Sequence, residues 1–148
     1  MVGAMQDSTT SSRDRLLDEA TSARDDSYAP YSGFRMGAAV ETRAGDVVRG
    51  ALVENVSLGL AMCAERAAMF GTVARGERPK ALALVAGRTA GQLTWPCGAC
   101  LQVALELGGP EVVVHVGDLD GVSDSATLAE LLPRAPYRPD IAGRAANG

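Results

Sequence analysis

Apolar residues recur at helical spacing in several parts of the chain. From Arg13, the segment RDRLLDEATSARDD places two leucines and Ala20 on one face, which predicts an amphipathic helix. The run CAERAAMFGTVARG, residues 63–76, is rich in helix-favouring alanine and methionine and ends at a glycine. A third helix is expected to follow Pro96, over CGACLQVALELGG, and SATLAELLP near the C-terminus predicts a short last helix.

Four other runs have the composition of β-strands. RMGAAVETR (35–43) and DVVRGALVE (46–54) are joined by an AGD tripeptide, which predicts a β-hairpin. PKALALVAG (79–87) and EVVVHV (111–116) are almost continuously apolar, as expected of strands that are buried on both faces. Strands that alternate with helices after an antiparallel hairpin predict an α/β sandwich around a mixed sheet.

The two ends of the chain differ from this pattern. Residues 1–12 are rich in serine and threonine and show no periodicity, so we expect a disordered N-terminal lead. A single domain is expected over 13–148, with a flexible tail from about residue 139. No apolar run approaches the roughly 20 residues of a membrane span, and the N-terminus does not resemble a secretion signal. We therefore expect no membrane partner and a cytoplasmic protein with reduced thiols.

Charge and composition narrow the range of partners. The formal net charge is −4, no basic run occurs, and only 4% of the residues are aromatic. A nucleic-acid backbone is therefore not an expected partner, because binding it requires basic side chains and stacking platforms. A small-molecule substrate is the expectation.

All three cysteines stand at predicted helix starts, and this placement indicates a metal site. Cys63 begins one helix, whereas Cys97 and Cys100 begin the next. Free N–H groups and the positive end of the helix dipole stabilise the thiolate form that binds metal. The C-x-x-C spacing lets two sulfurs of one turn point at one ion, and a third sulfur leaves a tetrahedral position open. Three protein ligands with an open position are typical of catalytic zinc, whereas structural zinc sites usually have four.

Two residues beside Cys63 fit a catalytic centre of this kind. Glu65 is close enough to the metal position to accept a proton from a water molecule there and to return it to a leaving group. Three thiolates on one divalent cation leave a net negative charge. Arg66 could offset that charge by donating a hydrogen bond to a cysteine sulfur, which makes it a candidate residue behind the ligands.

The cysteines also permit two other interpretations. Trp95-Pro96-Cys97-Gly98-Ala99-Cys100 is similar to a W-C-x-x-C redox motif, and a non-catalytic zinc-binding module is a further alternative. A redox pair requires neither a third cysteine nor a glutamate two residues after it, and a structural zinc site does not require Glu65. The single histidine, His115, lies in an apolar strand and is expected to be an ordinary strand residue.

Several blocks of sequence together resemble the zinc-dependent cytidine deaminases of the small homotetrameric type, which are related to the blasticidin-S deaminases. The resemblance extends from about Arg13 to Tyr137 and rests on separate motifs in the same order. These motifs are YAPYSGFRMGAA (28–39), VEN (53–55), CAER (63–66), PCGAC (96–100) and LLP (131–133).

This resemblance implies a three-layer α/β/α sandwich with a five-stranded mixed sheet and one zinc ion per subunit. It also implies hydrolysis of a cytidine-type nucleoside to the uridine product plus ammonia, a place in pyrimidine salvage, and a homotetramer. Cys63, Cys97 and Cys100 then match the zinc ligands, and Glu65 matches the proton shuttle. The matching substrate-binding positions are Phe34 beside the base, Glu54 at a ribose hydroxyl and Ala64 with its backbone at the pyrimidine.

The chain departs from the family pattern on the substrate side. Leu52 stands where the family has an asparagine, two positions before Glu54, and leucine cannot hydrogen-bond a ribose hydroxyl. Leu101 replaces a common arginine, and Pro136 replaces a phenylalanine that reaches a neighbouring active site, for which Tyr137 is the candidate substitute. Two substrates therefore remain open: cytidine with a weakened sugar contact, or another amino-heterocycle such as a blasticidin-type nucleoside.

Overall fold

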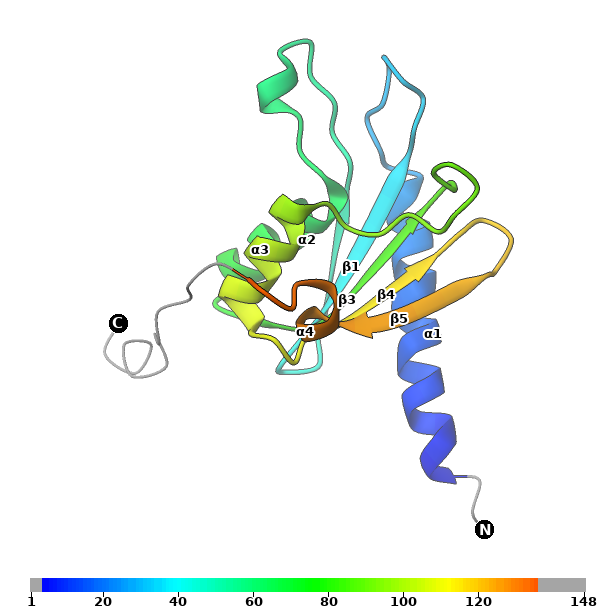
Figure 1. Ribbon diagram of the computed structural model, residues 1–148, viewed down its shortest axis with the longest axis vertical. Helices are drawn as coiled ribbons and strands as arrows, with labels where there is room; N and C mark the ends of the chain where they lie inside the picture. The colour runs from blue at the N-terminus through cyan, green and yellow to red at the C-terminus, as the bar shows by residue number, and fades with distance from the viewer. Residues whose placement is uncertain (1–3, 136–148) are drawn as a thin grey trace.

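The protein is built on one mixed five-stranded sheet, as seen in the computed structural model (Figure 1). The structure describes the backbone of residues 4–135 and the side chains of residues 12–135. The strand order is β2-β1-β3-β4-β5, with β3 and β4 parallel and every other neighbouring pair antiparallel. The elements are α1 (Ala4–Arg24), β1 (Met36–Thr42), β2 (Val47–Ala51), the 3-10 turn η1 (Leu58–Leu60), α2 (Ala64–Ala74), β3 (Pro79–Ala86), α3 (Gly98–Gly108), β4 (Val113–Gly117), β5 (Ser123–Thr127) and α4 (Leu128–Leu131).

Helices cover both faces of the sheet. Successive residues of the central strands point to opposite sides, and both sets are apolar, so each face has to be buried. Leu82 and Leu84 of β3 belong to one buried cluster, which also contains apolar residues of α2, α3 and α4. Ala83, between them, belongs to a second cluster with Leu16 and Ala20 of α1. The predicted three-layer α/β/α sandwich with a five-stranded mixed sheet is therefore confirmed.

The local predictions agree with most of these elements. The AGD tripeptide forms the turn between β1 and β2, with Gly45 at φ +92, a left-handed conformation that favours glycine. The helices expected after Cys63 and Pro96 are present, and the connection β3–α3–β4 joins the parallel pair. Within the part of the chain that the structure describes, no helix has the length and apolar content to cross a membrane.

Helix α1 is longer than the sequence pattern predicts. It begins at Ala4 instead of Arg13, so residues 4–12 belong to the helix, where the sequence pattern indicated no helix. Extending a helix that already exists adds about one hydrogen bond per residue fixed, so a segment without an apolar face can continue it. The expected tail from residue 139 lies outside the described residues.

The C-terminal part of the sheet corrects another prediction. Ser125–Thr127 belong to β5 and not to the last helix, which begins only at Leu128. Thr127 and Glu130 form a capping box that starts this helix, and the residues before it pair with β4. An edge strand as polar as SDSAT lacks the apolar pattern that marks a strand in sequence.

Candidate metal centre and active site

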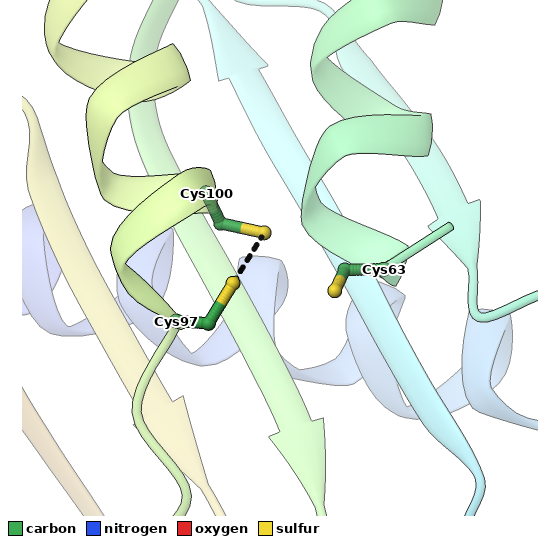
Figure 2. A group of neighbouring side chains, drawn as sticks. All are labelled: Cys63, Cys97 and Cys100. Carbon is green, nitrogen blue, oxygen red and sulfur yellow. Dashed lines mark hydrogen bonds between the residues drawn. The ribbon is translucent and has the colours of Figure 1, made fainter. Parts of the chain in front are cut away.

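The starts of α2 and α3 bring the three cysteines together. Cys63 is the N-cap of α2 and Cys97 the N-cap of α3, while Cys100 lies in the first turn of α3. The three sulfur atoms all lie within 4.8 Å of one another, and the Sγ atoms of Cys97 and Cys100 are 3.6 Å apart. Figure 2 shows the side chain of Cys63 on one helix beside the pair on the other.

This donor set fits a zinc ion. Tetrahedral zinc with Zn–S bonds of about 2.3 Å places its sulfur ligands roughly 3.8 Å apart, close to the spacing observed for the C-x-x-C pair. Among the described residues, this is the one group of three or more potential metal ligands that meets in space. Three sulfurs occupy three tetrahedral positions and leave the fourth for a water molecule or a substrate.

The surroundings of Cys63 favour its thiolate form. The pKa of Cys63 is lowered to about 5, chiefly by hydrogen bonding with Cys100 and also by Arg66, and this lowering outweighs the opposite effect of burial. The Arg66 Nη2 atom lies 3.4 Å from the Cys63 Sγ atom, which is the contact that the sequence predicted. Hydrogen bonds to Cys63 and Cys100 raise the pKa of Arg66, so its guanidinium stays charged beside the sulfurs.

Glu65 is buried beside the cysteines with one carboxylate oxygen free. The residue is 1% exposed, and within the described part of the chain its Oε2 atom has no hydrogen-bond partner. Burial raises the pKa of Glu65 to about 7, against a hydrogen bond from its own backbone N–H. A carboxyl group of this kind can both accept and donate a proton near neutral pH.

The predicted sugar-binding carboxylate is held by a neighbouring loop. The Glu54 Oε1 atom accepts hydrogen bonds from the Ser32 N–H at 3.2 Å and the Ser32 hydroxyl at 3.3 Å. The same hydroxyl accepts a bond from the Phe34 N–H at 3.0 Å, and the backbone of Tyr28 pairs with Leu52 and Glu54. Loop 28–34 and segment 52–54 therefore form one unit.

A known protein family matches most of the chain. Residues 10–116 match the family described as the cytidine and deoxycytidylate deaminase zinc-binding region. The chain belongs to this family. The predicted resemblance is therefore confirmed, and with it the zinc-binding deaminase character that the cysteine spacing indicated.

Similar proteins agree with this assignment. A cytidine deaminase from Halalkalibacterium halodurans is 43% identical over 129 residues, which span 87% of this chain and 97% of that protein. The crystal structure of a cytidine deaminase from Burkholderia pseudomallei superposes with a TM-score of 0.77 at 44% identity, covering 82% of this chain and 97% of that one. The cytidine deaminase structure from Mycobacterium tuberculosis gives a TM-score of 0.72 at 41% identity, with 84% and 96% covered.

The remaining residues predicted for the deaminase site occupy apolar surroundings. Phe34 and Leu52 are partly buried and pack against the larger core cluster, whereas Ala64 is fully buried in it. Leu101, at the position of the common arginine, is also a core residue. Tyr137 lies outside the described residues, together with Pro136.

One structural support of the deaminase site was missed by the sequence reasoning. The loop that leads from β3 to Cys97 is held by Arg88, whose Nε atom donates to the Asp118 carboxylate at 2.8 Å and whose Nη1 atom donates to the Gly91 carbonyl at 3.0 Å. Asp118 also accepts bonds from the backbone of the β4–β5 turn. Arg88 and Asp118 are far apart in sequence and belong to no motif, so no local signal could have identified the pair. Ser32 lies within the YAPYSGFRMGAA motif, but its partner Glu54 is distant in sequence, so its contact with that carboxylate was also missed.

His115 takes no part in the metal centre. Its Nδ1 atom lies 2.6 Å from the Ser125 hydroxyl on the neighbouring strand, and burial lowers the pKa of its imidazole. It alternates with Val114 and Val116, which belong to the cluster under α2 and α3, so it faces the other side of the sheet.

Proposed function

We propose that the protein is a zinc-dependent hydrolytic deaminase that converts cytidine and deoxycytidine to uridine and deoxyuridine with release of ammonia. The observation that carries this proposal is the buried Glu65 carboxylate, with a free oxygen, beside three sulfurs that converge on one point. The similar proteins named above are cytidine deaminases, which supports the choice of substrate class.

The cysteines and Glu65 have separate roles in this reaction. Cys63, Cys97 and Cys100 would hold the zinc ion, which supplies activation of a water molecule as a nucleophile at neutral pH. Glu65 accepts a proton from the attacking water at Oε2 and delivers it to the ring nitrogen beside the amino group. It then transfers the second proton to the departing amine, so that the C–N bond breaks and ammonia leaves while the ring carbon gains its oxygen.

Burial makes Glu65 suited to this role. A carboxyl with a pKa of about 7 is a stronger base than an exposed glutamate and still able to return the proton. A non-catalytic zinc-binding module would gain nothing from a buried carboxylate without a partner, since burying a polar group without a hydrogen bond is costly. The enzymatic function is therefore favoured over a purely structural one.

On the substrate side, we assign Glu54 to a ribose hydroxyl, Phe34 to one side of the base, and the Ala64 backbone to the pyrimidine. Glu54 is half-buried and already held by Ser32, so its carboxylate is oriented before substrate binds. The apolar side chain of Leu52, on the same segment, removes one polar contact that a ribose could use. This feature supports, as a second candidate, an amino-heterocycle whose sugar differs from ribose, such as a blasticidin-type nucleoside.

A panel of substrates tests both candidates. Ammonia release would be measured with cytidine, deoxycytidine, cytosine and a blasticidin-type nucleoside, on protein whose zinc content per subunit has been determined. We expect stoichiometric zinc and turnover of the first two compounds. Turnover of the antibiotic nucleoside alone would favour the second candidate, and zinc without any ammonia release would favour the non-catalytic module.

We further propose a cytoplasmic homotetramer that serves pyrimidine salvage. A groove between α2 and α3 is lined by Phe70, Val73, Val103 and Leu107, and the side chains of Phe70 and Val73 are exposed. Apolar area of this kind on a helix pair supports contact with another copy of the chain. The molar mass in solution tests this proposal: a tetramer is expected, and Phe70→Glu should shift it to smaller species, whereas a native monomer would contradict it.

A further inference from the structure

Helix α2 lies so close to β2 that only glycine fits between them. A Cβ atom at Gly50 would lie 2.4 Å from the Ala64 carbonyl oxygen, 2.4 Å from the Ala68 nitrogen and 2.9 Å from the Ala68 Cα atom. All three are backbone atoms, and real Cβ atoms essentially never approach other atoms within 3.0 Å. A side chain at this position therefore cannot be accommodated by turning a neighbouring side chain, and the helix itself has to move.

The part of α2 that would move is the part that carries the chemistry. Ala64 stands between Cys63 and Glu65 in the first turn of the helix. Reaching an ordinary contact distance from 2.4 Å requires a displacement of about 1 Å, which is large compared with the tolerance of roughly 0.2 Å on a metal–ligand distance. Cys97 and Cys100 lie at the start of α3, which packs against β3 and α4 as well as against α2. Because β3 and α4 also hold α3, a shift of α2 would change the distance from Cys63 to Cys97 and Cys100, while the spacing within that pair, set by one helical turn, stays the same.

We infer that Gly50 is a positioning residue of the metal centre. By letting the α2 backbone rest directly on β2, it sets the distance between Cys63 and the Cys97–Cys100 pair and the position of Glu65 beside them. Gly50 touches neither metal nor substrate and acts through the first turn of α2. This inference rests on the proposed zinc-binding role of the three cysteines.

The same hairpin contains a matched control on the opposite face of the sheet. A Cβ atom at Gly37 of β1 would lie 2.0 Å from the Ala20 carbonyl oxygen and 2.2 Å from the Arg24 nitrogen, both in α1. Gly37 pairs with Ala51, directly beside Gly50, so the two glycines are neighbours in adjacent strands. A methyl group at either position forces a helix off the sheet, but α1 carries none of the proposed zinc ligands.

The experiment compares Gly50→Ala with Gly37→Ala in the full chain. Zinc affinity would be measured by competition with a chelator, and ligand geometry by the absorption spectrum of the Co²⁺-substituted protein. We expect both variants to lose thermal stability. Only Gly50→Ala should weaken zinc binding, by at least about 10-fold, as is typical when support behind metal ligands is lost, and only this variant should change the Co²⁺ spectrum.

A second pair of variants applies if Gly50→Ala does not fold. Ala38→Val adds volume on the α2 face of β1, opposite Gly50, and Ala39→Val adds the same volume on the α1 face of the same strand. The first should weaken zinc binding and the second should not. Equal zinc affinity and equal Co²⁺ spectra within either pair would overturn the inference.

These measurements are made without substrate, so they are independent of the deaminase assay. Native protein that binds zinc but releases no ammonia would refute the proposed function and leave the role of Gly50 standing. Normal zinc affinity in Gly50→Ala, together with normal turnover of cytidine by the native protein, would refute the role of Gly50 and leave the proposed function standing.

Discussion

The metal side of the site and its proposed sugar side are built by different means. On the metal side, the proposed ligands and Glu65 come from the first turns of two helices, and the protein packs Glu65 and Cys100 out of contact with solvent. On the proposed sugar side, loop 28–34 and the segment that follows β2 meet through the Glu54–Ser32 bonds and a few backbone pairs, with Ser32 exposed.

This difference explains why the two sides tolerate change unequally. A helical turn holds its residues in a fixed relation, so losing one metal ligand or moving one turn disturbs all the others. A loop that is held by a few exposed hydrogen bonds can lose one polar group and keep its shape, because each such bond contributes only about 0.5–1.5 kcal/mol. Leucine at position 52, in place of the asparagine of the family pattern, is a loss of one polar group of this second kind.

The largest expected effect is on the metal side. Cys97→Ala removes one of three sulfurs, and two remaining thiolates would not retain the ion, so we expect loss of both zinc and ammonia release. Metal analysis of the purified variant and an activity assay check this prediction. Stoichiometric zinc in the variant would show that Cys97 is not a ligand.

Glu65→Gln separates proton transfer from metal binding. The amide has nearly the same shape but cannot accept and return the proton, so turnover should fall by at least about 100-fold while zinc stays bound. Ammonia release and zinc content on the same preparation test this. A variant with near-normal turnover would remove Glu65 from the mechanism.

Arg66→Gln tests the support behind the sulfurs. Without the hydrogen bond to Cys63, we expect zinc affinity to fall by about 10- to 100-fold, with the deamination of zinc-saturated protein less affected. Chelator competition measures the affinity. Arg66→Lys is the control that keeps the charge but not the planar geometry of the guanidinium, and unchanged affinity in both variants would mean that the contact is incidental.

Leu52→Asn tests the sugar side directly. A hydrogen bond gained to a ribose hydroxyl is worth about 0.5–1.5 kcal/mol, so kcat/KM for cytidine should rise by roughly 2- to 10-fold with zinc affinity unchanged. Leu52→Met is the matched control and should leave both quantities as they are. If Leu52→Asn lowers kcat/KM for cytidine and does not raise kcat/KM for any other substrate, the side chain at this position does not face the sugar.

The smallest effect is expected at the Arg88–Asp118 pair, at the start of the loop that leads from β3 to Cys97. Burial raises the pKa of Asp118, but hydrogen bonds from the Val122 N–H and from Arg88 outweigh it and bring the pKa below its ordinary 3.8. Since the folded-state pKa is lowered, the stabilisation is present above that ordinary value and is lost as the pH falls through the folded-state pKa.

Asp118→Asn should therefore lower the melting temperature at neutral pH, and the gap to the native protein should narrow below about pH 4. Thermal unfolding across a pH series measures the gap. A gap that is constant down to acidic pH would show that the carboxylate charge has no part in holding the loop.

Much of the fold could be predicted because strands such as ALALV and helices such as AERAAMF have a clear apolar pattern. The exceptions have physical reasons. The polar strand β5 owes its conformation to pairing with β4, and residues 4–12 continue a helix that the apolar residues after them establish. Neither cause is visible in the local sequence.

The sequence by itself determined the chemistry that depends on near neighbours in the chain. The C-A-E-R and P-C-G-A-C segments place cysteines at helix starts and a glutamate two residues after the first of them, since local helix geometry sets those relations. Only the tertiary structure decided what depends on packing between distant segments. It brings Cys63 to the Cys97–Cys100 pair, joins Glu54 to Ser32, and rests the α2 backbone on Gly50, because side chains and backbones far apart in sequence meet only when the core is formed.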